Sequence, residues 1–149
     1  MFDQVFILNG PNLNLLGRRE PEIYGHTTLA MVQEKCTALA DELGLNCRFH
    51  QSNYEGQLVE WIQEAFEQDA AVIINPAGLS YHSVPIYDAL KLIKAPVIEV
   101  HISNIHARGG VYSKSMVSLA ASGVICGLGT FGYYLALRSL AESRGSATP

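Results

Sequence analysis

Five short strand-like runs recur along the chain and predict the strands of one sheet. They cover residues 5–8, 47–51, 71–75, 97–101 and 124–127. Each run is of strand length, and each is separated from the next by a segment with a different apolar spacing. The chain therefore predicts strands that alternate with helices.

The segments between these runs carry apolar residues at helical spacing. In the first, Gly44 stands where a helix C-terminus belongs, and Pro85 lies in the first turn of the third. The last helix is expected from about Gly132 to Ser143, with Tyr134, Leu135 and Leu140 as its buried candidates. The other stripes are Leu29, Val32, Cys36, Leu39 and Leu43; then Leu58, Ile62, Ala65 and Phe66; then Val84, Ala89, Leu90 and Ile93.

Strand–helix alternation predicts an α/β fold with a parallel sheet covered on both faces. For five strands we expect the three-layer flavodoxin-like arrangement, with strand order 2-1-3-4-5 and a crevice at the carboxyl ends of strands one and three. Amide-rich loops at residues 9–12 and 75–78 would border that crevice, beside the end of strand four at residues 101–104. We assign residues 1–143 to a single catalytic domain and 144–149 to a flexible C-terminal tail.

Composition narrows the class of protein. A chain of 149 residues with 48% apolar and 16% charged residues indicates one globular domain. A net charge of −4 with scattered basic residues argues against nucleic acid as a partner. We expect no membrane association and a cytoplasmic location, because no apolar run has bilayer length and no leader follows Met1. The three cysteines form no CxxC pair, so neither a disulfide framework nor a zinc site is expected.

Glu99 and His101 are two residues apart on a predicted strand, so their side chains share one face of the sheet. A carboxylate beside a histidine orients the ring and favours its protonated form, as a general acid requires. The competing explanation is a structural histidine that bonds a neighbour at a strand end. The pair alone leaves both open.

The polar segment 18–25 predicts a loop over the edge of strand one, and it places Tyr24 near Arg19. A nearby guanidinium favours the phenolate form of a tyrosine, which makes Tyr24 a candidate base. An ordinary surface loop with solvated arginines and a packed tyrosine explains the same residues.

Farther along, Gly127, Gly129 and Gly132 match the dinucleotide-binding pattern GxGxxG, but no acidic ribose-binding residue follows in a second nucleotide-binding half. We interpret these glycines as permitting a tight turn and close helix–sheet packing.

Four blocks of sequence resemble the type II 3-dehydroquinate dehydratases. The first is ILNGPNLNLLG at residues 7–17, which continues through RREP at 18–21 and IYG at 23–25. The others are QSNYEG at 51–56, EVHISNIHAR at 99–108, and GVICGLG at 123–129. The likeness covers nearly the whole chain in order.

This resemblance implies a lyase that acts on a cyclic β-hydroxy ketone bearing a carboxylate, without a metal or organic cofactor. It implies Tyr24 as base, Arg19 as its activator, Asn12 as holder of an enolate-stabilising water, and His101 as acid oriented by Glu99. The substrate carboxylate would bind Asn75, Ser103 and the Ile102–Ser103 backbone. It further implies trimers grouped into a homododecamer, with Asp88 reaching the site of a neighbouring subunit.

The chain departs from the family pattern in one region. Tyr81 stands where the family has histidine, Tyr87 where it has arginine, and Gly109-Gly110-Val111-Tyr112 where it has two acids, phenylalanine and arginine. The family's histidine and arginine at 81 and 112 hold the ring hydroxyls. A tyrosine offers one hydrogen bond there but not the charged fork of arginine.

Four functions therefore stay open. The first is 3-dehydroquinate dehydration, and the second is the same reaction on a related carboxylated ring with altered hydroxyls. The third is a flavodoxin-like binding module, disfavoured because the loop at residues 9–12 offers neither a phosphate cradle nor a phospho-acceptor aspartate. The fourth is an inactive scaffold subunit, which the joint presence of Tyr24, Arg19, Glu99 and His101 speaks against.

Overall fold

The computed structural model describes residues 1–145, apart from the side chain of Tyr24, and contains a five-stranded parallel sheet. Its strands lie in the order β2-β1-β3-β4-β5, so the predicted order is confirmed. In chain order they are β1 (Gln4–Asn9), β2 (Asn46–Gln51), β3 (Ala71–Asn75), β4 (Val97–His101) and β5 (Gly123–Cys126).

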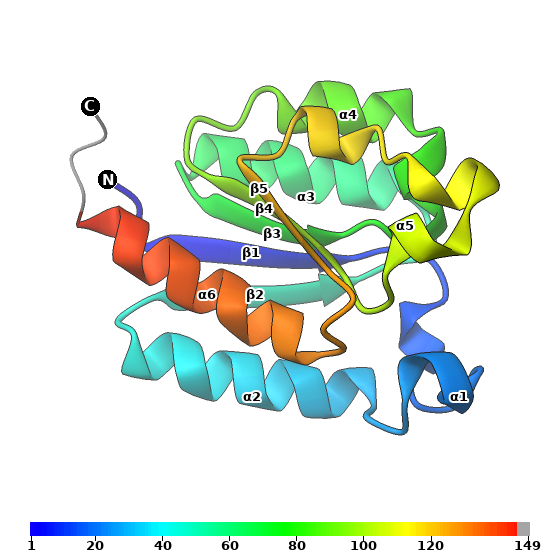
Figure 1. Cartoon of the computed structure of the whole chain (residues 1–149). Coiled ribbons are helices and arrows are strands. Elements are labelled where there is room, and N and C mark those ends of the chain that lie inside the picture. Colours follow the sequence, from blue (N-terminus) through cyan, green and yellow to red (C-terminus); the bar gives the residue numbers. More distant parts are fainter. Residues whose placement is uncertain (146–149) are drawn as a thin grey trace.

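Helices cover both faces of the sheet (Figure 1). α2 (Leu29–Glu42) and α6 (Phe131–Arg144) lie on one face, and α3 (Glu55–Glu67) and α4 (Val84–Leu90) lie on the other. Shorter elements gather near the carboxyl ends of the strands: α1 (Pro21–Tyr24), α5 (Ile105–Arg108), and the 3-10 turns η1 (Leu13–Leu15), η2 (Ala77–Tyr81) and η3 (Gly110–Ser113). A further 3-10 turn, η4 (Val117–Leu119), packs beside α4. Within residues 1–145, no helix combines the length and apolar character needed to cross a bilayer.

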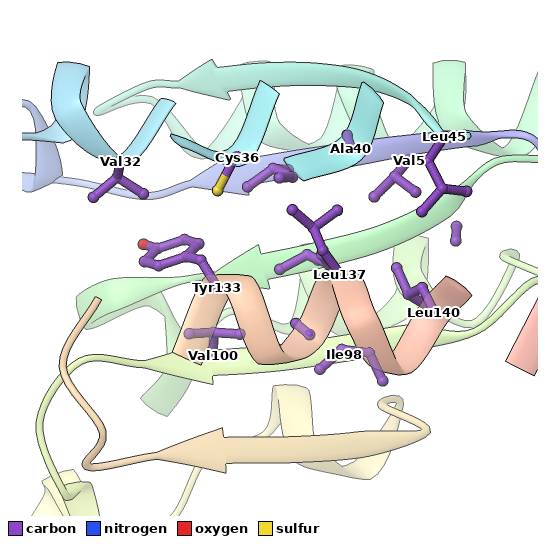
Figure 2. Close-up of a cluster of buried hydrophobic side chains, with 14 of the residues drawn as sticks. Val5, Val32, Cys36, Ala40, Leu45, Ile98, Val100, Tyr133, Leu137 and Leu140 are labelled. Atoms are coloured by element: carbon purple, nitrogen blue, oxygen red, sulfur yellow. The ribbon is translucent and has the colours of Figure 1, made fainter. Parts of the chain in front are cut away.

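Each strand of the sheet centre divides its side chains between two cores. On β1, Val5 and Ile7 pack toward α2 and α6, while Phe6 and Leu8 pack toward α3 and α4. This two-residue alternation follows from the strand period, and burial of both faces explains why the strands read as continuous apolar runs. Figure 2 shows the first core, in which Cys36 is fully buried as its place on the helical stripe predicted.

The buried face of α6 differs from the expected one. Leu140 is buried, but Tyr134 and Leu135 are only half-buried, and the remaining contacts come from Tyr133, Ala136 and Leu137. The prediction for Tyr134 and Leu135 was wrong. The buried stripe starts at Tyr133 and continues three, four and seven residues later, at Ala136, Leu137 and Leu140. Tyr134 and Leu135 lie beside this stripe.

The first residue of the predicted C-terminal tail, Arg144, belongs to α6. It lies in the last turn of the helix, and its Nη1 donates to the carbonyl of Gly44 at 2.8 Å. Gly145 follows as the C-cap of the helix, and residues 146–149 of the expected tail lie outside the described residues. Where Gly44 ends α2 as predicted, its φ of +71° is the left-handed conformation that favours glycine.

Tyr133 joins the carboxyl ends of three strands. Its hydroxyl donates to Asn9 Oδ1 at 2.7 Å and accepts from Asn75 Nδ2 at 2.9 Å, and Asn9 Nδ2 in turn donates to the carbonyl of His50 at 3.0 Å. Tyr133 is fully buried at the arrowhead end of the core in Figure 2. Burial raises the pKa of Tyr133 above its usual range, so the hydroxyl remains a protonated donor.

The loops that follow β1 and β3 cross in close contact. The amide of Gly10 donates to the carbonyl of Asn75 at 2.9 Å, and a Cβ at position 10 would lie 2.5 Å from the carbonyl oxygen of Pro76. Only glycine permits this approach. The crossing brings the two amide-rich loops to one edge of the sheet.

We predict that Tyr133→Phe destabilises the fold, because it leaves Asn9 Oδ1 and Asn75 Nδ2 buried without this partner. A buried polar group that loses its partner costs about 1–3 kcal/mol, which corresponds to a fall of several degrees in Tm. Thermal unfolding followed by circular dichroism measures the change. Tyr54→Phe is the control, since Tyr54 is exposed. Equal Tm values for the two variants would contradict the bridging role.

Candidate active site

A cavity of about 250 Å³ lies at the carboxyl ends of β1, β3 and β4. This is the crevice expected from the strand order. The residues around it include several that sequence reasoning singled out: Asn12, Arg19, Asn75, Tyr81, His101, Ile102, Ser103 and Tyr112. Apolar side chains such as Leu13, Leu16 and Ile105 complete the wall. The volume suits a single small ring.

His101 and Glu99 form a buried pair at one side of the cavity. His101 Nε2 lies 3.0 Å from Glu99 Oε2, and His101 is 4% exposed whereas Glu99 is fully buried. Because Nε2 bonds Glu99, Nδ1 is the ring nitrogen left for a bound molecule. The pair therefore has the geometry of a proton-transferring histidine oriented by a carboxylate.

Two serines that sequence reasoning missed complete the Glu99 site. Ser118 Oγ lies 2.7 Å from Glu99 Oε1 and 2.9 Å from Oε2, and Ser115 Oγ donates to Oε1 at 3.0 Å. Both come from the segment after η3, far along the chain from β4. No local pattern marks them, because a serine becomes a carboxylate donor only when the fold places it there.

Asn12 is held in place by side chains of the QSNYEG block at residues 51–56. Its backbone is left-handed, with φ of 71°, and its amide donates to Asn53 Oδ1 at 2.9 Å. Gln51 Nε2 donates to Asn53 Oδ1 at 3.1 Å and to the carbonyl of Gly10 at 3.2 Å. Sequence reasoning assigned no role to these two side chains, which hold the first loop in place.

The segment after η1 carries the proposed base and its activator. Arg19 lines the cavity with its side chain half-exposed, and its Nε lies 3.9 Å from Glu20 Oε2. Tyr24 ends α1, but its side chain lies outside the described part of the structure. The backbone therefore places Tyr24 at the end of a short helix, within the segment that the sequence predicted to be a loop.

Asn75, Ile102 and Ser103 meet on one side of the cavity. Asn75 Oδ1 accepts from the amide of Ala77 at 3.2 Å while its Nδ2 bonds Tyr133, so the side chain is held at both ends. The carbonyl of Ile102 accepts from the amide of Gly129 at 3.0 Å. These contacts leave a rigid group of amide and hydroxyl donors that can bind an anion.

Two of the tyrosines at which the chain departs from the family pattern, Tyr81 and Tyr112, line the cavity. The rings of Tyr81 and Tyr112 meet edge to face with centroids 5.4 Å apart, and the Arg108 guanidinium lies 4.4 Å from the centroid of the Tyr112 ring. Arg108 also lines the cavity, and sequence reasoning gave it no role of its own. This wall is aromatic, with one cation behind it.

Tyr87 and Asp88 lie on α4, outside the residues that line the cavity. Asp88 is exposed and pairs with Lys91 Nζ at 3.4 Å, and the same ammonium lies 4.6 Å from the centroid of the Tyr87 ring. The structure therefore brings Asp88 to the surface and not into the site of its own chain.

The glycine-rich segment supports β4. Gly127 and Gly129 have φ values of +86° and +62°, and the amide of Gly127 donates to the carbonyl of His101 at 3.2 Å. A Cβ at Gly132 would lie 3.2 Å from Val100 Cγ1. The interpretation of these glycines as turn and packing residues is confirmed.

Other nucleophiles and ligand clusters are sparse. Burial raises the pKa of Cys36 to about 12 and that of Cys47 to about 11, so both thiols stay protonated and unreactive at neutral pH. Within residues 1–145, no three His, Cys, Asp or Glu side chains gather closely enough to ligate one metal ion.

Comparison with known proteins agrees with the fold and the sequence blocks. The family model described as dehydroquinase class II matches residues 3–141. The 3-dehydroquinate dehydratase of Brucella canis is 55% identical over 95% of this chain and 90% of the relative. 3-Dehydroquinate dehydratase 1 of Agrobacterium fabrum is 51% identical over 94% of this chain and 97% of the relative.

A solved structure gives the same result in three dimensions. The type II dehydroquinase from Propionibacterium acnes superposes with a TM-score of 0.92 at 46% identity, covering 95% of this chain and 98% of the other. The resemblance of the four sequence blocks is thereby confirmed, and with it the five-stranded fold. This chain belongs to the class II dehydroquinase family.

Proposed function

We propose that this protein eliminates water from 3-dehydroquinate through an enolate to give 3-dehydroshikimate, as a cofactor-free hydro-lyase. The observation that carries the proposal is the buried Glu99–His101 pair, whose histidine lines the same cavity as Asn12. Family membership and the names of the relatives supply the substrate. The direct test incubates purified protein with 3-dehydroquinate and follows the conjugated enone product in the ultraviolet.

The proposed chemistry needs a base, an acid and a stabilised oxyanion. Tyr24, as tyrosinate, removes the proton next to the ketone, and the Arg19 guanidinium favours that tyrosinate. Asn12 holds a water that donates to the enolate oxygen. His101, charged beside Glu99, then gives its Nδ1 proton to the departing hydroxyl, and the elimination restores the ketone conjugated to the new double bond.

The substrate carboxylate anchors the ring in this proposal. Asn75, Ser103 and the Ile102–Ser103 backbone would bind it, supported by the rigid hold that Tyr133 and Gly129 exert on this side of the cavity. A fixed carboxylate would keep the reacting carbons between the first loop and His101. Positioning of this kind supplies a large part of catalytic rate.

Assembly and location belong to the same proposal. The family resemblance favours trimers grouped into a homododecamer in the cytoplasm, with Asp88 reaching a neighbouring site. The exposed position of Asp88 on α4 is compatible with such a contact. A binding module or an inactive subunit would not need a buried carboxylate beside a cavity-lining histidine.

A second candidate is the same dehydration on a carboxylated ring with fewer or altered hydroxyls. The aromatic wall of Tyr81 and Tyr112 favours it, because neutral rings replace groups that hold ring hydroxyls in the family. A charge-assisted hydrogen bond is about twice as strong as a neutral one. The ordinary substrate would then bind weakly here.

We predict that Tyr24→Phe and His101→Ala each lower kcat on 3-dehydroquinate by at least ~10²-fold, the usual contribution of a positioned proton-transfer group. Tyr54→Phe and His106→Ala are matched controls on exposed residues outside the cavity. Circular dichroism should show an unchanged fold in all four variants. Near-normal turnover by Tyr24→Phe would remove Tyr24 as the base.

The double variant Tyr112→Arg with Tyr81→His separates the two candidate substrates. If the native substrate carries altered hydroxyls, wild-type kcat/KM on 3-dehydroquinate should be low and should rise in the double variant. Wild-type protein that is already efficient and is damaged by the double change would rule out the altered substrate. Tyr112→Phe keeps the ring and removes only the hydroxyl, so a loss in kcat/KM there would show that the hydroxyl contacts the ring of the substrate.

We also predict a large homo-oligomer at micromolar concentration, with a dodecamer as the expected species. Sedimentation velocity measures the assembly directly. A monomer as the single species under these conditions would contradict the assembly and, with it, the role of Asp88 in a neighbouring site.

A further inference from the structure

Glu99 is a carboxyl group that is buried among hydrogen-bond partners. Its side chain is fully buried in the central part of the sheet, on β4 between β3 and β5. Its hydrogen bonds in the described part of the chain come from His101, Ser115 and Ser118. Burial without a partner would favour the protonated acid, so these donors decide whether Glu99 stays ionised.

We propose that Ser118, assisted by Ser115, is a positioning residue that keeps Glu99 ionised and its carboxylate directed at His101. The inference deepens the proposed function and rests on it, because it concerns the acid of the same reaction. Ser118 Oγ lies within 2.9 Å of both carboxylate oxygens, whereas Ser115 reaches Oε1 only. A hydroxyl has one proton to donate, so Ser118 bonds either oxygen and holds the carboxylate plane in place.

The other charged side chains around the Glu99–His101 pair have contacts of their own or line the cavity. On the cavity side, Arg19 and Arg108 line the pocket, and neither forms an ion pair with Glu99 in the described part of the chain. On the packed helices, Glu55 of α3 accepts from Ser83, and Asp88 of α4 pairs with Lys91 at the surface. His101 is therefore the titratable partner of Glu99, and the serines supply its remaining stabilisation.

The serine segment is held firmly enough to position a carboxylate. Val117, next to Ser118, is fully buried in the core beneath α3 and α4. The amide of Met116 donates to the carbonyl of Ser80 at 2.7 Å, and the amide of Ala121 donates to the carbonyl of Val117 at 3.1 Å. Ser118 thus sits in a short turn fixed on both sides, and its hydroxyl can offer Glu99 a preorganised bond.

The consequence for catalysis follows from the charge of Glu99. An ionised Glu99 favours the imidazolium of His101, which is the acid, and orients it through Nε2. Losing the Ser118 bond destabilises the ionised form of Glu99 more than the protonated form, because a hydroxyl bonds a charged acceptor more strongly. The pair should then lose its active charge state at a higher pH than in the wild type.

The test measures pH profiles of kcat and kcat/KM for wild type, Ser118→Ala, Ser118→Thr and Ser113→Ala. Ser118→Thr retains the hydroxyl. Ser113 bonds the carbonyl of Gly110 in the same segment and does not contact Glu99, so Ser113→Ala is the matched control. Circular dichroism and sedimentation report the fold and assembly of each variant.

We expect Ser118→Ala to lower kcat roughly 10- to 100-fold, the scale of a lost hydrogen bond to a charged group. KM should change little, and the acidic limb should move to higher pH by about one unit. Ser118→Thr should restore both values, and Ser113→Ala should match the wild type. If Ser118→Ala does not fold, Ser115→Ala tests the same proposal with a smaller expected shift.

An unshifted acidic limb in Ser118→Ala would overturn the proposal, whether kcat is normal or falls together with Tm, because a purely structural serine would leave the pH profile in place. If wild-type protein does not convert 3-dehydroquinate, the proposed function fails instead. The inference is then decided by infrared pH-difference spectra of the free protein. The carboxylic-acid band absent from Glu99→Gln should titrate at higher pH in Ser118→Ala, and an identical titration would refute the role of Ser118.

Discussion

The hydroxyl of Tyr133 bonds two asparagines at the point where β1 and β3 end, and the cavity lies directly beyond that point. Asn9 and Asn75 are buried polar side chains, and each finds a partner in this one hydroxyl. A buried amide without a partner destabilises the fold. The packing of α6, which carries Tyr133, and the positions of the loops that follow β1 and β3 therefore depend on each other. The close crossing of Gly10 and Pro76 depends on the same arrangement, because it needs the two strand ends at a fixed separation.

The site itself combines two kinds of electrostatic environment. On β4, the carboxylate of Glu99 lies away from water and is stabilised by His101 and two serine hydroxyls. On the segment after η1, Arg19 lines the cavity with its side chain half-exposed. The buried histidine–carboxylate pair therefore lies on the sheet, whereas the half-exposed guanidinium lies on a segment outside it.

The aromatic wall is formed by Tyr81 and Tyr112, which line the cavity together. Tyr81 and Tyr112 come from two turns that are joined by the bond between Met116 and Ser80, so the wall and the serine support of Glu99 belong to one connected region. Arg108 lies against the Tyr112 ring and brings a cation to a wall that is otherwise neutral. Arg108, Tyr112, Ser115 and Ser118 therefore all belong to the segment that joins β4 to β5.

The sequence by itself determined the elements, their order and most of the site. Periodicity located the strands and helices, the alternation of the two implied the parallel sheet, and four specific blocks indicated the family. The interpretation of Glu99 and His101 as neighbours needed only the strand period, since residues two apart share a face. Local pattern was weaker at α6, where counting from the wrong residue exchanged Tyr134 for Tyr133.

Only the tertiary structure decided which distant side chains support the site. Ser115 and Ser118 reach Glu99 across 16 and 19 residues of chain, Gln51 reaches the first loop across 41, and Tyr133 reaches Asn9 across 124. A serine, glutamine or tyrosine has the same local signature on a solvated surface as in such a contact. The folded chain alone shows which of these side chains lie away from water beside a buried carboxylate or amide, because burial is what makes each hydrogen bond necessary.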